Sequence, residues 1–124
     1  MEKNILIVDD VMFNIEFEEI IIKSLVKKLK IDTINIDTAY TMTEAIEKIT
    51  ENKYDAMFID MNLPDGSGVD VAKFARKKDP DTRIAALTIY PSIFEKERAN
   101  FDLFLKKPIM PNIYEQNFIR LLQL

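Results

Sequence analysis

In four places along the chain, a short apolar run stops abruptly at a polar or charged residue. The runs and the residues that end them are Ile5–Val8 before Asp9 and Asp10, Ala56–Ile59 before Asp60, Ile84–Leu87 before Thr88, and Leu103–Leu105 before Lys106 and Lys107. Continuous apolar runs of this length are typical of parallel strands that are covered on both faces. The pattern therefore predicts buried strands with polar residues at their carboxyl ends.

Helical patterns lie between the predicted strands. The strands are expected at Lys3–Val8, Thr33–Thr38, Ala56–Ile59, Arg83–Ile89 and Leu103–Leu105. Apolar residues near the 3.6-residue period predict helices at Asn14–Leu29 and Val69–Lys77. A capping-box sequence at Thr41 predicts another helix, Ser67 is the expected cap of the Val69–Lys77 helix, and Pro111 precedes the last one. A short fourth helix is expected at Ile93–Ala99.

Strands that alternate with helices predict an α/β fold. Right-handed crossovers place such strands in one parallel sheet with helices on both faces, a doubly wound arrangement. Ligands bind such sheets outside the carboxyl ends of the strands. The carboxylates, the hydroxyl and the ammonium that end the four apolar runs are therefore expected to meet at one edge.

Composition narrows the class of protein. The 124 residues are enough for one domain, and the 48% apolar and 31% charged residues are ordinary for a globular chain. The net charge of −4, with no basic stripe, argues against direct binding of nucleic acid. No apolar run has the length of a membrane span, and no signal peptide is visible, so a cytoplasmic protein that does not bind membranes is expected.

Histidine and cysteine are both absent from the sequence. Without imidazole there is no Ser-His-Asp or Cys-His pair, no typical zinc site and no phosphohistidine on this chain. Any chemistry must use carboxylates, hydroxyls, lysine and a hard cation.

The carboxylates predict a metal site. Asp9, Asp10 and Asp60 in one pocket would raise one another's pKa unless a cation held them together, and all-oxygen ligands suit Mg²⁺ or Mn²⁺. The bland alternative is a cluster of solvated acids. Asp60 can act as a nucleophile that forms an acyl phosphate. The Pro- and Gly-rich turn that follows leaves the backbone carbonyl of Asn62 free to face a metal, whereas Asp65 reads as a turn residue.

Two further candidates come from the later strands. Thr88 offers a hydroxyl to a phosphoryl oxygen, although a β-branched residue that simply fills a strand is the alternative. Lys106 and Lys107 lie on opposite faces by the period of a strand, and either ammonium could contact a phosphoryl group. The Lys107-Pro108 bond is a candidate cis peptide.

These motifs together resemble the receiver domains of two-component response regulators, which have a chemotaxis-protein-like fold. The resemblance rests on Ile5–Asp10, Phe58–Gly68, Thr88 and Phe104–Pro108, in that order and nearly end to end. It implies a flavodoxin-like (βα)5 domain over residues 1–124 with strand order 2-1-3-4-5 and five helices. It also implies a signalling phosphoacceptor, which phosphorylates itself from a donor and loses the phosphoryl group slowly, instead of an enzyme with a separate substrate.

The resemblance assigns roles by position. Asp60 matches the phosphoacceptor, Asp10 and Asp60 with the Asn62 carbonyl match direct Mg²⁺ ligands, and Asp9 matches a ligand through water. Thr88 and Lys107 match the switch hydroxyl and the phosphate-binding lysine. Phe104 matches the aromatic switch.

The resemblance also implies partners. The implied phosphoryl donor is a histidine kinase or a histidine phosphotransfer protein, the implied partner is an output protein, and a homodimer can form on phosphorylation. With no output segment after Leu124, the sequence is expected to be either a stand-alone receiver or one domain of a larger protein.

The chain departs from the family pattern around the switch. Ile89 stands where a small residue usually follows the switch threonine, so it would narrow access to Asp60. The Thr88–Lys107 segment is about three residues shorter than usual, and Tyr90-Pro91 compresses its loop.

Three alternatives remain at the level of sequence. A receiver-like interaction module that is not phosphorylated would keep the fold with an inert switch. A Mg²⁺-dependent phosphohydrolase usually has Asp-x-Asp on its first strand and a cap, and this chain has Asp-Asp and no room for a cap. A flavodoxin-like FMN carrier needs a Ser-, Thr- and Gly-rich loop after the first strand, which is missing here.

Overall fold

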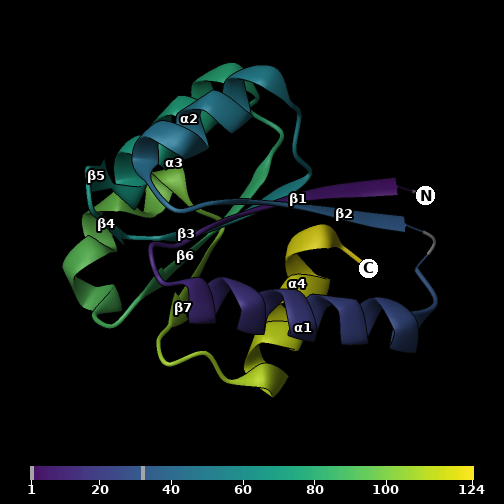
Figure 1. Cartoon of the computed structure of the whole chain (residues 1–124). Coiled ribbons are helices and arrows are strands. Elements are labelled where there is room, and N and C mark those ends of the chain that lie inside the picture. Colours follow the sequence, from purple (N-terminus) through teal and green to yellow (C-terminus); the bar gives the residue numbers. More distant parts are fainter. Residues whose placement is uncertain (1, 32) are drawn as a thin grey trace.

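The structure is a computed structural model that describes residues 2–31 and 33–124, with the backbone alone for residues 91–95. Five parallel strands form one sheet in the order β2-β1-β3-β6-β7. They are β1 (Glu2–Val8), β2 (Thr33–Ala39), β3 (Ala56–Asp60), β6 (Arg83–Thr88) and β7 (Leu103–Lys106). Counted along the chain this order is 2-1-3-4-5, so the predicted doubly wound sheet is confirmed (Figure 1).

Four α-helices cover the two faces of the sheet. They are α1 (Met12–Leu29), α2 (Met42–Glu51), α3 (Gly68–Lys78) and α4 (Pro111–Leu122). Helices α1 and α4 lie on one face, and α2 and α3 lie on the other (Figure 1). Alternate residues of β1 enter the two cores, with Ile5 and Ile7 on the side of α1 and α4 and Leu6 and Val8 on the side of α2 and α3. In the part of the chain that is described, no helix has both the length and the hydropathy of a membrane span.

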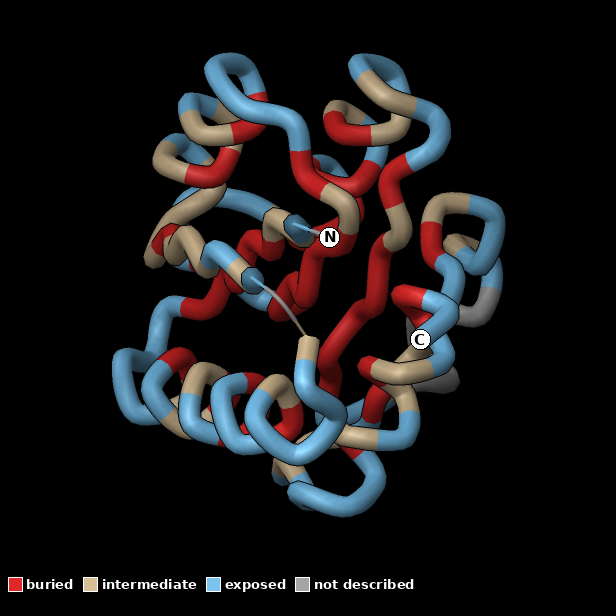
Figure 2. Tube along the Cα trace, turned by 90° about the vertical axis from the view of Figure 1, so that its right-hand side faces the viewer, coloured by how far each residue is buried: buried red, intermediate tan, exposed pale blue. Residues whose placement is uncertain are grey.

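Burial follows the layers. Figure 2 shows the strands as a buried centre and the outward faces of the helices as exposed. Three large apolar residues of the predicted helices break the pattern, because Ile20, Leu29 and Ile113 are 64%, 42% and 53% exposed. Leu29 is the last residue of α1, and Ile113 lies in the first turn of α4, so both lie at helix ends.

The expected fourth α-helix at Ile93–Ala99 is wrong in type. The backbone of Pro91–Asn100 instead forms a 3₁₀ helix, η1. Few of its ten residues are apolar, so the sequence offers little of the stripe that makes an α-helix stable against a sheet. Within the described residues there are therefore four α-helices and one 3₁₀ helix, where five helices were expected.

The turn after β3 is more ordered than the sequence indicates. Two short strands, β4 (Asn62–Leu63) and β5 (Gly66–Ser67), pair antiparallel within it. The Ser67 hydroxyl accepts a hydrogen bond from the Val69 N–H at 3.1 Å, which confirms the predicted cap of α3. Asp65 accepts hydrogen bonds from the N–H groups of Met42 and Thr43, at 2.7 and 3.0 Å, so it caps α2. The predicted Thr41 cap is confirmed too, since its hydroxyl accepts from the Glu44 N–H at 3.0 Å.

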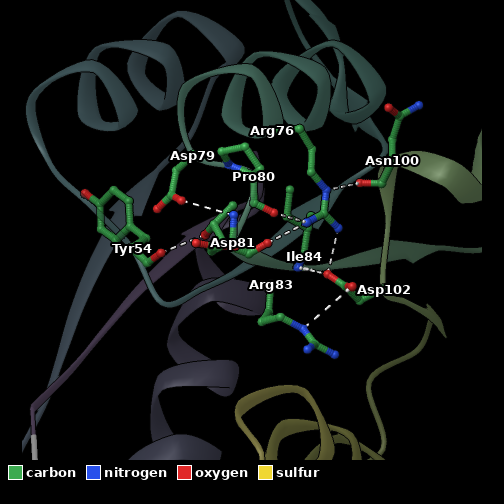
Figure 3. Close-up of polar contacts among 10 residues, drawn as sticks. Tyr54, Arg76, Asp79, Pro80, Asp81, Arg83, Ile84, Asn100 and Asp102 are labelled. Atoms are coloured by element: carbon green, nitrogen blue, oxygen red, sulfur yellow. Dashed lines mark hydrogen bonds and ion pairs between the residues drawn. The ribbon is translucent and has the colours of Figure 1, made fainter.

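At the amino ends of the strands, one arginine joins several elements. Arg76 of α3 pairs with Asp102 (Nη2 to Oδ2, 2.7 Å) and donates to the carbonyls of Thr82 (2.6 Å) and Asn100 (3.3 Å). Asp102 also accepts a hydrogen bond from the Ile84 N–H at 2.8 Å. These contacts tie α3 to the beginnings of β6 and β7 and to the end of η1 (Figure 3).

Candidate functional site

The polar residues that end the strands lie together at the carboxyl edge of the sheet, as the sequence predicts. Asp9 follows β1, Asp60 ends β3, Thr88 ends β6 and Lys107 follows β7. These four strands are consecutive neighbours in the sheet. The Met61 N–H bonds the Leu87 carbonyl at 3.1 Å, and the Lys107 N–H bonds the Thr88 carbonyl at 2.9 Å, so the ladder continues to the edge of the site.

Three carboxylates meet at this edge. One oxygen each from Asp9, Asp10 and Asp60 lies within 4.8 Å of the other two. Asp9 and Asp60 are buried, whereas Asp10 is exposed, so the cluster opens to solvent on one side. A set of convergent carboxylate oxygens with an open side fits a small, hard divalent cation that keeps some of its water. The three residues therefore suit Mg²⁺ or Mn²⁺.

Asp9 is oriented by several donors. Its Oδ1 accepts from the Val11 N–H at 2.9 Å, and its Oδ2 accepts from Lys107 Nζ at 3.1 Å. The Asn14 amide lies 3.3 and 3.5 Å from the two carboxylate oxygens. Asn14 is not one of the site residues predicted from the sequence. Its position one helical turn after Asp10, at the beginning of α1, is the signal that could have found it.

Of the two candidate lysines, Lys107 lies at the acidic cluster. Lys107 Nζ lies 3.1 Å from Asp9 Oδ2 and 3.4 Å from Asp60 Oδ1, while Lys106 is exposed. Burial works to lower the pKa of Lys107, but the charges of Asp9 and Asp60 outweigh it and hold that pKa above its usual value. Lys107 is therefore a permanent positive charge between two carboxylates. The Lys107-Pro108 peptide is cis, as predicted.

Asp60 is buried at the bottom of the cluster. Burial raises its pKa to about 6, against Lys107, whose positive charge lowers it, and with Asp9, whose negative charge raises it further. The Asn62 N–H donates to Asp60 Oδ1 at 3.2 Å. Either oxygen of the ionised Asp60 carboxylate has the lone pairs that a nucleophile needs to form an acyl phosphate.

A glycine makes room for this end of β3. The Gly68 N–H bonds the Met61 carbonyl at 3.1 Å, which brings the beginning of α3 against the strand end. A Cβ at Gly68 would lie 2.5 Å from the Asp60 carbonyl oxygen and 2.9 Å from Ile59 Cγ2. Any side chain there would push on the backbone that carries Asp60.

The candidate switch residues lie on both sides of η1. Thr88 is buried, and its hydroxyl accepts a hydrogen bond from the Tyr90 N–H at 3.2 Å. Phe104 is partly buried, with its ring 5.3 Å from that of Phe101 and the Arg98 guanidinium 5.7 Å above it. Ile89 and Tyr90 are more than half exposed at the same edge.

Beneath the site, a buried acid was missed by the sequence reading. Glu18 of α1 is 1% exposed, and Tyr114 of α4 donates a hydrogen bond to its Oε1 at 2.8 Å. A sequence signal exists, because Glu18 takes an apolar position in the stripe of Ile15, Ile22 and Leu25.

Comparisons with known proteins identify the family to which the chain belongs. The chain matches the family described as "Response regulator receiver domain" over residues 5–116. It is 34% identical over 85 residues to the response regulator PilR of Pseudomonas aeruginosa, covering 66% of this chain and 18% of PilR. It is 30% identical over 115 residues to the chemotaxis protein CheY of Thermotoga maritima, covering 90% of this chain and 91% of CheY.

A solved response regulator structure is also similar to this chain. The response regulator TrrA of Thermotoga maritima, solved in complex with Mg²⁺-BeF, superimposes with a TM-score of 0.72 at 30% identity and covers 96% of this chain and 98% of its own. The fold and the family match together define a receiver of the two-component type. The chain belongs to the response regulator receiver domain family, as the sequence motifs predict. It spans 18% of PilR, so nothing that the rest of PilR does is carried over.

Proposed function

We propose that this receiver domain accepts a phosphoryl group on Asp60 and that the acyl phosphate switches a surface which binds a partner. The observation that carries the proposal is the position of Asp60. Its carboxylate is buried at a strand end, beside Asp9 and Asp10 and 3.4 Å from the Lys107 ammonium. A nucleophile, a set of metal ligands and a fixed positive charge are the parts that phosphoryl transfer to a carboxylate requires.

In the proposed reaction, an Asp60 oxygen attacks the phosphorus of a phosphohistidine. The new P–O bond forms as the P–N bond breaks, and the departing imidazole nitrogen takes up a proton from solvent. Lys107 neutralises charge on the transferring group, and it is already aimed between Asp9 and Asp60. Asp9, Asp10, Asp60 and the Asn62 carbonyl would hold a Mg²⁺ or Mn²⁺ ion, which supplies further positive charge to the phosphoryl oxygens when bound.

The switch would begin at Thr88. A hydroxyl has one donor hydrogen and two acceptor lone pairs, so Thr88 can donate to a phosphoryl oxygen. Turning toward Asp60 draws its oxygen away from the Tyr90 N–H, which it accepts at 3.2 Å. Loss of that bond would release the beginning of the segment that leads into η1, and Phe104 would repack behind it. The result is a two-state surface.

The proposed setting is a two-component pathway in the cytoplasm. The donor would be a histidine kinase or a histidine phosphotransfer protein, since this chain contains no histidine of its own. The output would be a protein partner, and a homodimer formed on phosphorylation is one form it can take. The domain would act as a phosphoacceptor with slow loss of the phosphoryl group, and it would contact neither nucleic acid nor membrane.

Acetyl phosphate with Mg²⁺ tests the proposal without a cognate donor. We expect a mass increase of one phosphoryl group that requires Mg²⁺ and disappears with hydroxylamine. Asp60→Asn should abolish the increase. Asp70→Asn, the same substitution at an exposed position of α3, should keep it. The absence of any adduct, with no Mg²⁺ binding, would favour the inert interaction module instead.

A further inference from the structure

A carboxyl group and a phenol are buried together between α1 and α4. Glu18 and Tyr114 are 1% and 2% exposed, and the Tyr114 hydroxyl donates to Glu18 Oε1 at 2.8 Å. Their surroundings are otherwise the apolar cluster that α1 and α4 make with the sheet. A buried polar pair in such a cluster is stable while its members are neutral and hydrogen-bonded.

The pair connects the segments that carry the phosphorylation site. The Tyr114 ring stacks on Phe58, with centroids 4.9 Å apart, and Phe58 lies two residues before Asp60 in β3. Helix α1 begins just after Asp10, and α4 begins four residues after Lys107. The Glu18–Tyr114 hydrogen bond therefore joins the helix that follows the acidic pair to the helix that follows the lysine.

Charge decides whether the pair stays closed. Burial raises the pKa of Glu18 to about 8, although the hydrogen bond from Tyr114 lowers it. Tyr114 from α4 contacts Glu18 directly, whereas Asp9 after β1, Lys107 after β7 and Asp60 from β3 act on it through their charges: the two aspartates raise its pKa and Lys107 lowers it. Burial also holds the pKa of Tyr114 well above its usual value, so the phenol keeps its proton. Near neutral pH the pair is uncharged.

We propose that Glu18 and Tyr114 form a proton-dependent lock between α1 and α4. The lock is closed while the Glu18 carboxyl holds its proton. When that proton leaves to solvent, a carboxylate remains in an apolar cluster, and the cost of burying it loosens the packing of α4 and of the segment that carries Lys107. The lock goes beyond the proposed phosphorylation, because it needs neither a phosphodonor nor a metal.

Carbon-13 NMR of the unphosphorylated protein, labelled at glutamate carboxyl groups, tests the lock directly. Glu18 is identified as the signal that Glu18→Gln lacks, and its midpoint is expected near pH 8. Amide exchange in α4, corrected for intrinsic rates, is followed in the same samples. Protection of α4 should fall as the pH rises from 4.5 toward the Glu18 midpoint, by up to about ten-fold per pH unit, and should level off above that midpoint. Glu18→Gln keeps a hydrogen-bonding group that cannot ionise, so its α4 protection should stay constant.

Two further variants sharpen the test. Glu16→Gln is the same substitution at an exposed position of α1, and it should behave as the wild type does. Tyr114→Phe removes the donor that lowers the Glu18 pKa, so the midpoint should move upward. If Glu18→Gln does not fold, Glu18 is identified instead as the signal whose midpoint moves upward in Tyr114→Phe, and the pH dependence of α4 protection in the wild type then decides the matter. A Glu18 midpoint near 4.5, or an equal loss of α4 protection in Glu18→Gln and wild type, would overturn the lock.

Discussion

Lys107 brings a positive charge to the acidic cluster. Its ammonium lies between Asp9 and Asp60 and offsets the repulsion of the two buried carboxylates. Lys107→Ala should slow phosphorylation by acetyl phosphate by about ten-fold or more, because the variant lacks the positive charge that Lys107 places beside the transferring phosphoryl group. The measurement is the rate of adduct formation by intact mass. Lys106→Ala, at the exposed neighbour, should react at the wild-type rate, and equal slowing of both variants would contradict the role of Lys107.

Glu18 makes a separate prediction about stability and pH. Its pKa is raised by burial from 4.5 to about 8 in the folded state, so its contribution is fully favourable below pH 4.5 and is lost as pH rises to about 8. Over that window the wild type should lose up to about 1.4 kcal/mol per pH unit relative to Glu18→Gln. Urea unfolding of the two proteins from pH 4.5 to pH 9 measures the difference. Parallel curves would mean that Glu18 has an ordinary pKa.

Gly68 is expected to be intolerant of any side chain. A Cβ there would meet the Asp60 carbonyl oxygen and Ile59, which belong to a packed strand end. Gly68→Ala should lower the free energy of unfolding by about 1–3 kcal/mol, as overpacking does. Gly66→Ala is the matched control, because its Cβ would meet the flexible end of the Met42 side chain, which can move. Urea unfolding compares the two, and equal stability of both variants would count against the close packing at Gly68.

At the scale of elements, the contacts of Arg76 hold the amino end of the sheet together. Asp102 accepts from both Arg76 and the Ile84 N–H, so Asp102→Ala leaves two donors without their acceptor. The variant should lose about 1–3 kcal/mol of unfolding free energy. Asp81→Ala, at an exposed position of the loop before β6, should lose much less. Thermal unfolding separates these outcomes, and an unchanged melting temperature for Asp102→Ala would show that the contacts of Arg76 add little.

The elements that the sequence predicted best are those with one strong physical signal. The strands of the sheet centre are continuous apolar runs, and their burial on both faces confirms why. The 3₁₀ helix over Pro91–Asn100 was missed because helix type depends on tertiary packing that a segment with few apolar residues does not reveal. The β4–β5 pair was missed because two-residue strands carry no periodicity.

At the scale of the site, the sequence predicts which residues end the strands but not which residues hold them. Asp9, Asp60, Thr88 and Lys107 follow from one rule, since the carboxyl ends of parallel strands share an edge. Asn14 beside Asp9 and the Glu18–Tyr114 pair depend on how helices pack on the sheet, which spacing along one chain does not fix. The choice between Lys106 and Lys107 needed the family resemblance first and the structure afterwards.

In the molecule as a whole, the amino ends and the carboxyl ends of the strands are held by different contacts. The amino edge is closed by the contacts of Arg76, and the carboxyl edge carries the acidic cluster with Lys107. Because the contacts of Arg76 lie at the amino ends of the strands, the loops around Asp60 at the carboxyl ends can move without breaking them. We therefore expect phosphorylation to move the loops of the carboxyl edge and to leave the contacts of Arg76 unchanged.

Chemical mapping of the phosphorylated residue shows whether Asp60 is the phosphoacceptor. Protein treated with acetyl phosphate and Mg²⁺ is reduced with borohydride, which converts an aspartyl phosphate to homoserine, and is then digested for tandem mass spectrometry. We expect homoserine at position 60, and none when Mg²⁺ is withheld. Homoserine at position 9 or 10, or at no position, would contradict this expectation.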